Sequence, residues 1–326
     1  MRGKFKINRL LNKNVYLLGI LMIFIVFFSV FDSNFLSTAN IINISRVVVL
    51  VAITGAAATF LLVAGYIDLS VGSTLALGAT TFAWLCSRGV PIAVSVIIII
   101  CVGAVIGIFN GFGVTKLKIH AVIFTLSTFY IVKGLNLLLY GIEPISVSKP
   151  GFTFLGRGMV KGIPFQVFII LFIVGIFYFL EKKSLLYKYA VAIGGNRSAA
   201  SLSGIKVNLY VIILYSLTGA LAGLSGAIFT SKLAVGQQLV GYGFEFDVIV
   251  AMLVGGTSFT GGQGSVIGTL IGAIILTIVD NGFNMIGVLS FYQYIIKGII
   301  LIIAVLALSL NLRRRDKSKT LNSINS

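Results

Sequence analysis

Charged and catalytic side chains are scarce in this chain of 326 residues. Only 10% of the residues are charged, against roughly a quarter in soluble domains, which excludes a soluble globular protein. One histidine, two cysteines and eight acidic residues leave few groups for acid-base chemistry, and none of them cluster with the spacing of a metal site. The phosphate-binding pattern G-x-x-x-x-G-K-[ST] is also absent, so we expect any nucleotide to be bound by a partner.

The single histidine, His120, is not expected to act as a base. It lies close to Lys116 and Lys118 at the start of a hydrophobic run, a position typical of a solvated residue at the membrane surface. A Ser-His-Asp triad has no supporting nucleophile motif. We therefore predict no catalytic residue and no metal ligand, and an intramembrane enzyme such as a lipid-linked transferase is disfavoured.

Long hydrophobic runs fill most of the chain, and 58% of its residues are hydrophobic. A helix needs about 20 residues to cross roughly 30 Å of hydrocarbon, and lipid requires backbone hydrogen bonds to close within helices or a barrel. Because the runs do not alternate as barrel strands do, we predict an all-α polytopic transmembrane bundle, one domain over residues 15–310. The ten expected spans are Val15–Phe31, Val47–Ala64, Val71–Ser87, Ile92–Val114, Ala121–Tyr140, Phe165–Leu180, Val207–Thr230, Phe246–Gly255, Val266–Phe283 and Tyr292–Leu310.

Basic residues gather where they set membrane orientation. Most of them lie in four segments, residues 2–13, 116–118, 181–206 and 313–319. Ten spans place all four segments on one side, as the positive-inside rule requires, so we expect cytoplasmic tails at residues 1–14 and 311–326. This placement explains the net charge of +17 without nucleic acid, because no basic face with interleaved aromatic residues occurs.

One expected span, Phe246–Gly255, is too short to cross a membrane alone. Omitting it would put the basic cluster Arg313–Arg315 outside, against the charge rule. We therefore predict a discontinuous or partly re-entrant segment, which marks a transport pathway in other membrane proteins. The alternative is an ordinary short helix followed by a flexible glycine-rich loop.

The longest polar interruption between hydrophobic runs is residues 181–206, EKKSLLYKYAVAIGGNRSAASLSGIK. Asn196 is placed to cap a short helix over Arg197–Ser203, and Gly204 is placed to end it. Such an exposed helix suits the docking of a soluble partner. The alternative is a solvated basic loop that only fixes orientation.

Glycines recur four residues apart within several runs. Small residues at this spacing let helix backbones approach closely, so we predict a tightly packed bundle. The residues concerned are Gly103, Gly107, Gly111, Gly219, Gly223, Gly268 and Gly272.

Charges within the runs are costly in lipid and are expected to be paired or functional. Asp280 and Lys297 flank the last expected outer turn at similar depth, which predicts a structural ion pair. Asp68 lies at a break between two spans. With only Glu245 and Asp247 added, the acids are too few for an obvious proton relay.

Three stretches resemble the permease subunits of ribose-type sugar importers of the ATP-binding-cassette (ABC) class. They are AGYIDLSVGSTLALGA at Ala64–Ala79, AIGGNRSAASLSGI at Ala192–Ile205, and the run Phe246–Lys297, which contains LVGGTSFTGGQGSVIGTLIGA. With FNGF at Phe109–Phe112 and TLSTFYIVKGL at Thr125–Leu135, the likeness covers most of residues 45–310 in order and spacing.

The resemblance implies a bacterial cytoplasmic (inner) membrane subunit that pairs with an identical or related permease. It further implies a cytoplasmic ABC ATPase, which binds ATP and Mg, and an extracytoplasmic sugar-binding protein; this chain itself would hold no cofactor. In that family the central cytoplasmic loop docks the ATPase. The matching residues are Gly194, Gly195, Asn196, Ala199, Ala200, Ser203, Gly204 and Ile205. Arg197 departs from the acidic residue that similar permeases often carry.

The expected function is then ATP-driven import of a monosaccharide, a ribose-like pentose or a hexose, with the loop transmitting ATPase motion to the spans. Polar residues that are candidates for the pathway, or equally for hydrogen bonds between helices, are Asp68, Ser70, Asn110, Asn281 and Asn284. Alternatives are import of branched-chain amino acids or nucleosides, or a stand-alone secondary transporter driven by an ion gradient.

Overall fold

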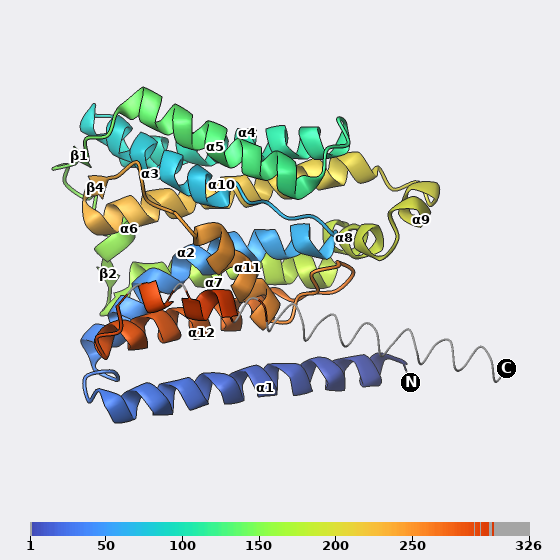
Figure 1. Ribbon diagram of the computed structural model, residues 1–326, viewed down its shortest axis with the longest axis horizontal. Helices are drawn as coiled ribbons and strands as arrows, with labels where there is room; N and C mark the ends of the chain where they lie inside the picture. The colour runs from blue at the N-terminus through green and yellow to red at the C-terminus, as the bar shows by residue number, and fades with distance from the viewer. Residues whose placement is uncertain (1, 290, 294, 300–301, 303–326) are drawn as a thin grey trace.

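The computed structural model describes residues 2–289, 291–293, 295–299 and 302. Its helices run mostly along one axis (Figure 1). They are α1 (Arg2–Phe31), α2 (Thr38–Val63), α3 (Val71–Ser87), α4 (Ile92–Thr115), α5 (Ala121–Tyr140), α6 (Phe154–Arg157), α7 (Phe165–Lys183), α8 (Leu185–Gly195), α9 (Arg197–Leu202), α10 (Val207–Leu233), α11 (Phe244–Val254) and α12 (Val266–Met285). Six of the described helices are long and apolar enough to cross a membrane, namely α2, α4, α5, α7, α10 and α12.

The expected spans up to Val266–Phe283 each coincide with a helix, but some boundaries differ. α2 begins at Thr38 rather than Val47, because the Ser37 hydroxyl accepts a hydrogen bond from Asn40 N at 3.3 Å and caps it. α1 begins at Arg2, so the expected tail 1–14 continues the first span as helix. The expected span Tyr292–Leu310 lies largely, and the tail 311–326 wholly, outside the described residues.

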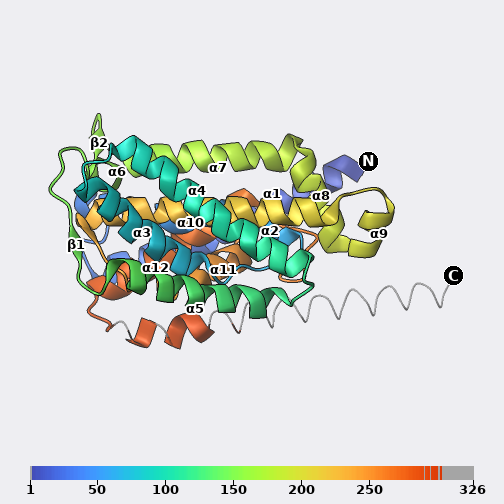
Figure 2. The same cartoon turned by 90° about the horizontal axis from the view of Figure 1, so that it is seen from above.

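α10 is the central helix of one half of the bundle, packed against α2, α3 and α4. Figure 2 shows α5 and α7 on opposite sides of it. A Cβ on Gly103 would overlap Gly219 O, and a Cβ on Gly219 would overlap Gly103 O. The close backbone approach predicted from glycine spacing is therefore confirmed for α4 and α10.

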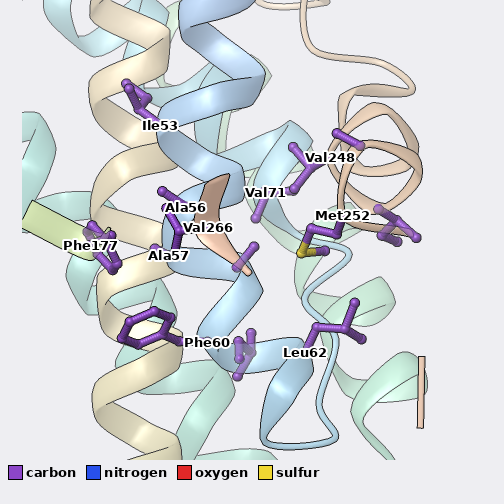
Figure 3. Packing of buried hydrophobic residues seen from close by; sticks show 14 of the residues in the cluster. Ile53, Ala56, Ala57, Phe60, Leu62, Val71, Phe177, Val248, Met252 and Val266 are labelled. Atoms are coloured by element: carbon purple, nitrogen blue, oxygen red, sulfur yellow. The ribbon is translucent and has the colours of Figure 1, made fainter. Parts of the chain in front are cut away.

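The other half of the bundle centres on α12, which packs against α1, α2 and α11. Gly268 and Gly272 bring the α12 backbone against α11 in the same way, at Gly255 and Ala251. The apolar core between the halves is continuous, and Figure 3 shows α2 contributing Ile53, Ala56, Ala57, Phe60 and Leu62.

The two ends of the bundle differ. At one end lie α6 and four two-residue strands, a small addition to the predicted all-α fold (Figure 1). β1 (Ile145–Ser146) pairs antiparallel with β4 (Val235–Gly236), and β2 (Met159–Val160) with β3 (Ile163–Pro164). At the opposite end, α8 and α9 project from the bundle (Figure 1).

Candidate functional site

The polar segment 181–206 folds into two short helices rather than one. α8 was not predicted; it begins where Ser184 Oγ accepts a hydrogen bond from Tyr187 N at 3.3 Å. The one helix predicted here is confirmed as α9, the second of the two, with Asn196 Oδ1 accepting from Ala199 N at 3.0 Å. Gly204 follows with φ +84°, a left-handed conformation that stops the helix. The caps thus set where each of the two helices of this projection begins and where α9 ends.

The α8–α9 projection presents a mostly exposed surface. Gly195 to Ala199 and Ser201 to Gly204 are all exposed, and the Leu202 side chain is 90% exposed. Ala200 and Ile193 are buried and anchor the two helices. Apart from Leu202, the exposed residues of this surface are small or polar.

The base of the projection lies directly on the end of α2. A Cβ on Gly194 would overlap Val63 O and would come within 2.7 Å of Gly262 N. Gly262 N itself donates to Val63 O at 2.8 Å. Gly194 is thus in close backbone contact with both α2 and the 255–265 loop.

Two side chains fasten the same region to α12. Glu181 Oε2 accepts a hydrogen bond from Val266 N, the first residue of α12, at 2.7 Å, and Glu181 Oε1 lies 2.9 Å from Lys182 Nζ. Tyr187 OH donates to Gly264 O at 2.7 Å. Burial raises the pKa of Tyr187 well above its ordinary value, which keeps the hydroxyl protonated as a donor.

Three of the five predicted pathway residues meet in one buried cluster. Asp68 Oδ1 accepts from Ser70 N at 2.8 Å and from Ser70 Oγ at 2.6 Å. Asn110 of α4 donates to Ser70 Oγ at 2.8 Å and to Asp68 Oδ1 at 3.2 Å. Asp68 Oδ2 and Asn110 Oδ1 are buried without a hydrogen-bond partner in the described chain, which leaves acceptor capacity for water or a passing solute.

Hydrogen bonds from neighbouring helices also hold the irregular segment 64–70 between α2 and α3. Tyr215 of α10 donates its hydroxyl to Ile67 O at 2.9 Å, and Leu69 N donates to Thr125 Oγ1 of α5 at 3.1 Å. Segment 64–70 directly follows Val63, the residue of α2 that contacts Gly194 of α8. It therefore connects that contact to the start of α3.

The other two predicted pathway residues, Asn281 and Asn284, lie elsewhere. Asn281 exchanges two side-chain hydrogen bonds with Asn40 of α2, at 2.8 and 2.9 Å. Asn284 accepts from Gln293 Nε2 at 2.8 Å. Both are joined to other elements in the manner of polar contacts that hold membrane helices together.

The predicted pair Asp280 and Lys297 is part of a larger group. Lys297 Nζ lies 2.9 Å from Asp280 Oδ2 and 2.8 Å from Asp247 Oδ1. The sequence pattern does not place Asp247 with this pair, because α11 precedes α12 and the depth of its residues is not evident from the pattern.

The sequence did not predict that Glu181 and Tyr187 would hydrogen-bond to the start of α12 and to the loop before it. Glu181 is the only acid among the basic residues of segment 181–206, and that isolation was the available signal. Among the described residues, no three His, Cys, Asp or Glu side chains lie together in a way that would hold a metal ion.

Comparison with known proteins assigns the family. The model of the family described as "Branched-chain amino acid transport system / permease component" matches residues 40–305. The ribose import permease protein RbsC of Bacillus subtilis is 40% identical over 88% of this chain and 89% of its own length. RbsC of Escherichia coli K12 is 36% identical over 88% of this chain and 90% of its own. The galactose/methyl galactoside import permease protein MglC of the same strain is 35% identical over 92% and 95%.

No solved structure matches the chain. The family match nevertheless extends over the bundle from α2 to α12 and includes the α8–α9 projection. The relatives are transport components, so ATP hydrolysis is the work of another subunit and this chain is not an enzyme. The chain therefore belongs to the permease family described as "Branched-chain amino acid transport system / permease component", which its match to the ribose import permeases also supports.

Proposed function

We propose that this chain is the transmembrane subunit of an ABC importer that takes up a monosaccharide, a ribose-like pentose or a hexose. The observation that carries the proposal is the identity of 35–40% to ribose and galactose import permeases over most of both chains. Import of branched-chain amino acids or nucleosides is less favoured, although the family description names the former. A stand-alone ion-coupled transporter is less favoured too.

The proposed assembly contains a second permease subunit, a cytoplasmic ABC ATPase that binds ATP and Mg, and an extracytoplasmic sugar-binding protein, in a bacterial cytoplasmic (inner) membrane. The chain would cross this membrane about ten times with both termini cytoplasmic. Segment 181–206 would lie in the cytoplasm as the coupling segment of the single permease domain 15–310. This orientation is supported by the basic residues of the segment and by the positive-inside rule.

The geometry supports a coupling role for the α8–α9 projection. The ATPase would bind the exposed residues around Asn196 and Leu202, and its motion would reach α2 through Gly194 and Val63 and α12 through Glu181. From Val63 it would pass along segment 64–70 to the start of α3. The pathway would then open and close as one part of the bundle rocks against the other, as in other transporters with discontinuous helices.

The test is uptake into vesicles that contain the assembled transporter, with labelled D-ribose, D-galactose and L-leucine. We expect uptake of one of the sugars only when ATP, the ATPase and the binding protein are all present. Uptake by this chain alone under an ion gradient, or uptake of leucine in place of both sugars, would contradict the proposal.

A further inference from the structure

A cavity of about 210 Å³ lies between α3, α5 and the segment that leads into α11. Its polar lining comes from Ser73 of α3, Lys133 of α5 and Gln238, and its aromatic lining from Phe129 and Tyr242. This volume is below the roughly 300 Å³ at which pockets for drug-sized ligands begin, so the cavity suits a ligand of about one ring.

The cavity lies where two short helices begin. α3 has 17 residues and α11 has 11, and each follows a non-helical segment, residues 64–70 before α3 and residues 237–243 before α11. Their starts are in backbone contact, because a Cβ on Gly241 would come within 2.5 Å of Gly72 O. Substrates of membrane transporters bind where discontinuous helices end inside the bundle, since exposed backbone groups and helix dipoles are available there.

Lys133 places a positive charge inside an apolar helix. It lies within α5, and its Nζ is 5.7 Å from the centroid of the Tyr242 ring. No ion pair of Lys133 occurs among the described residues. A cation within a span is costly unless it serves a purpose, and a cation over an aromatic face is stabilised without being neutralised.

Glu245 supplies a second unsatisfied group beside the cavity. Its side chain is buried, with the residue 7% exposed, and its Oε2 has no hydrogen-bond partner in the described chain. That oxygen lies against Gly72 and near Gly241 O, whose chain neighbours Ser73 and Tyr242 line the cavity.

The remaining walls are held in place. Gln238 is 3% exposed and donates from Nε2 to Glu143 O at 2.8 Å, while Asn136 of α5 donates to Gln238 O at 3.2 Å. The Ser73 hydroxyl donates to Ser70 O at 2.9 Å and keeps its lone pairs free to accept. The Tyr242 side chain, 75% exposed, offers a flat ring to the C–H face of a sugar.

We infer that this cavity is the contact site for the transported monosaccharide, with Lys133 and Ser73 bonding its hydroxyl groups and Tyr242 stacking on its ring. The inference rests on the proposed function, which supplies the sugar class. The site need not bind tightly, since an external binding protein supplies the sugar at high local concentration. Ser73 lies one turn into α3, downstream of segment 64–70, so displacement of that segment would alter the site.

The test is saturation-transfer difference NMR on the assembled transporter in lipid nanodiscs without the binding protein, with D-ribose, D-galactose and L-leucine as probes. Tyr242→Leu and Lys133→Gln are compared with Tyr130→Leu, a matched control on α5 whose ring is 65% exposed and does not line the cavity. Tyr242 is largely exposed, so its replacement should leave folding intact even where Lys133→Gln does not.

We expect a saturation signal from one of the sugars in the wild type and in Tyr130→Leu, reduced about fivefold or more in both cavity variants. Vesicles from the same preparations are assayed for uptake. Sugar uptake by the wild type without any sugar signal, a signal that survives both cavity variants, or a signal from leucine instead of both sugars would overturn the inference. Failure of sugar uptake itself would instead overturn the proposed function on which the sugar assignment rests.

Discussion

The Glu181 carboxylate joins α7 to α12 at the base of the α8–α9 projection. It is buried, accepts from Val266 N at 2.7 Å and faces the first turn of α12, where the helix dipole favours a negative group. A hydrogen bond to a charged acceptor contributes more than a neutral one, and a buried donor left without a partner is costly. This hydrogen bond between Glu181 and Val266 therefore links segment 181–206 to the half of the bundle that centres on α12.

Replacing Glu181 by alanine is expected to destabilise the protein by about 1.5–3 kcal/mol, because Val266 N loses its charged acceptor. Thermal unfolding of the detergent-solubilised chain, followed by loss of the monodisperse peak on size-exclusion chromatography, measures the effect. Glu143→Ala is the matched control, since the Glu143 side chain is exposed and such surface changes are usually within about 0.5 kcal/mol. Equal shifts for the two variants would show that the Glu181 contact contributes nothing.

At the scale of elements, the contact of α4 with α10 depends on glycine at set positions. A Cβ on Gly107 would overlap Tyr215 O and would lie 2.6 Å from Tyr215 C, whereas a Cβ on Gly175 of α7 would meet no atom within 4 Å. The same substitution at these two glycines should therefore have opposite outcomes. Tyr215 also holds Ile67, so separation of α4 and α10 would disturb segment 64–70.

Gly107→Ala is expected to cost about 1–3 kcal/mol through overpacking, while Gly175→Ala should be neutral or stabilise by up to about 1 kcal/mol through helix propensity. Both are measured by thermal unfolding in the same detergent. If Gly175→Ala proved the more damaging, the described packing of α4 and α10 would be wrong.

Most helices of this fold were predictable, because long apolar runs have few other solutions in lipid. α8 was missed since LLYKYAVAIGG is 11 residues long and lies between charged residues, so it carries no spanning signal. The capped helix α9 was predicted from Asn196 and Gly204, which act locally. The meeting of Asp68 with Asn110 joins residues far apart in the chain, and only the packing of α3 and α4 brings them together.

At the scale of the whole molecule, the coupling segment and the strand-bearing end lie at opposite ends of the bundle (Figure 1). α10 connects them: it has 27 residues, from Val207 to Leu233, and thus spans about 40 Å at roughly 1.5 Å per residue. Under the proposed coupling, motion at α8–α9 would be carried over that distance by packed helices. In that proposal the motion would enter the bundle at the backbone contacts of Gly194 and at the hydrogen bond of Glu181.

The central claim is that the ATPase docks on the α8–α9 projection, and photo-crosslinking tests it most directly. A benzoylphenylalanine is placed at Leu202, 90% exposed on α9, and in a second variant at Leu233, 38% exposed at the far end of α10. In the assembled transporter in lipid, the account predicts crosslinking of position 202 to the ATPase subunit and none from position 233. Crosslinking to the ATPase from position 233 but not from position 202 would contradict it.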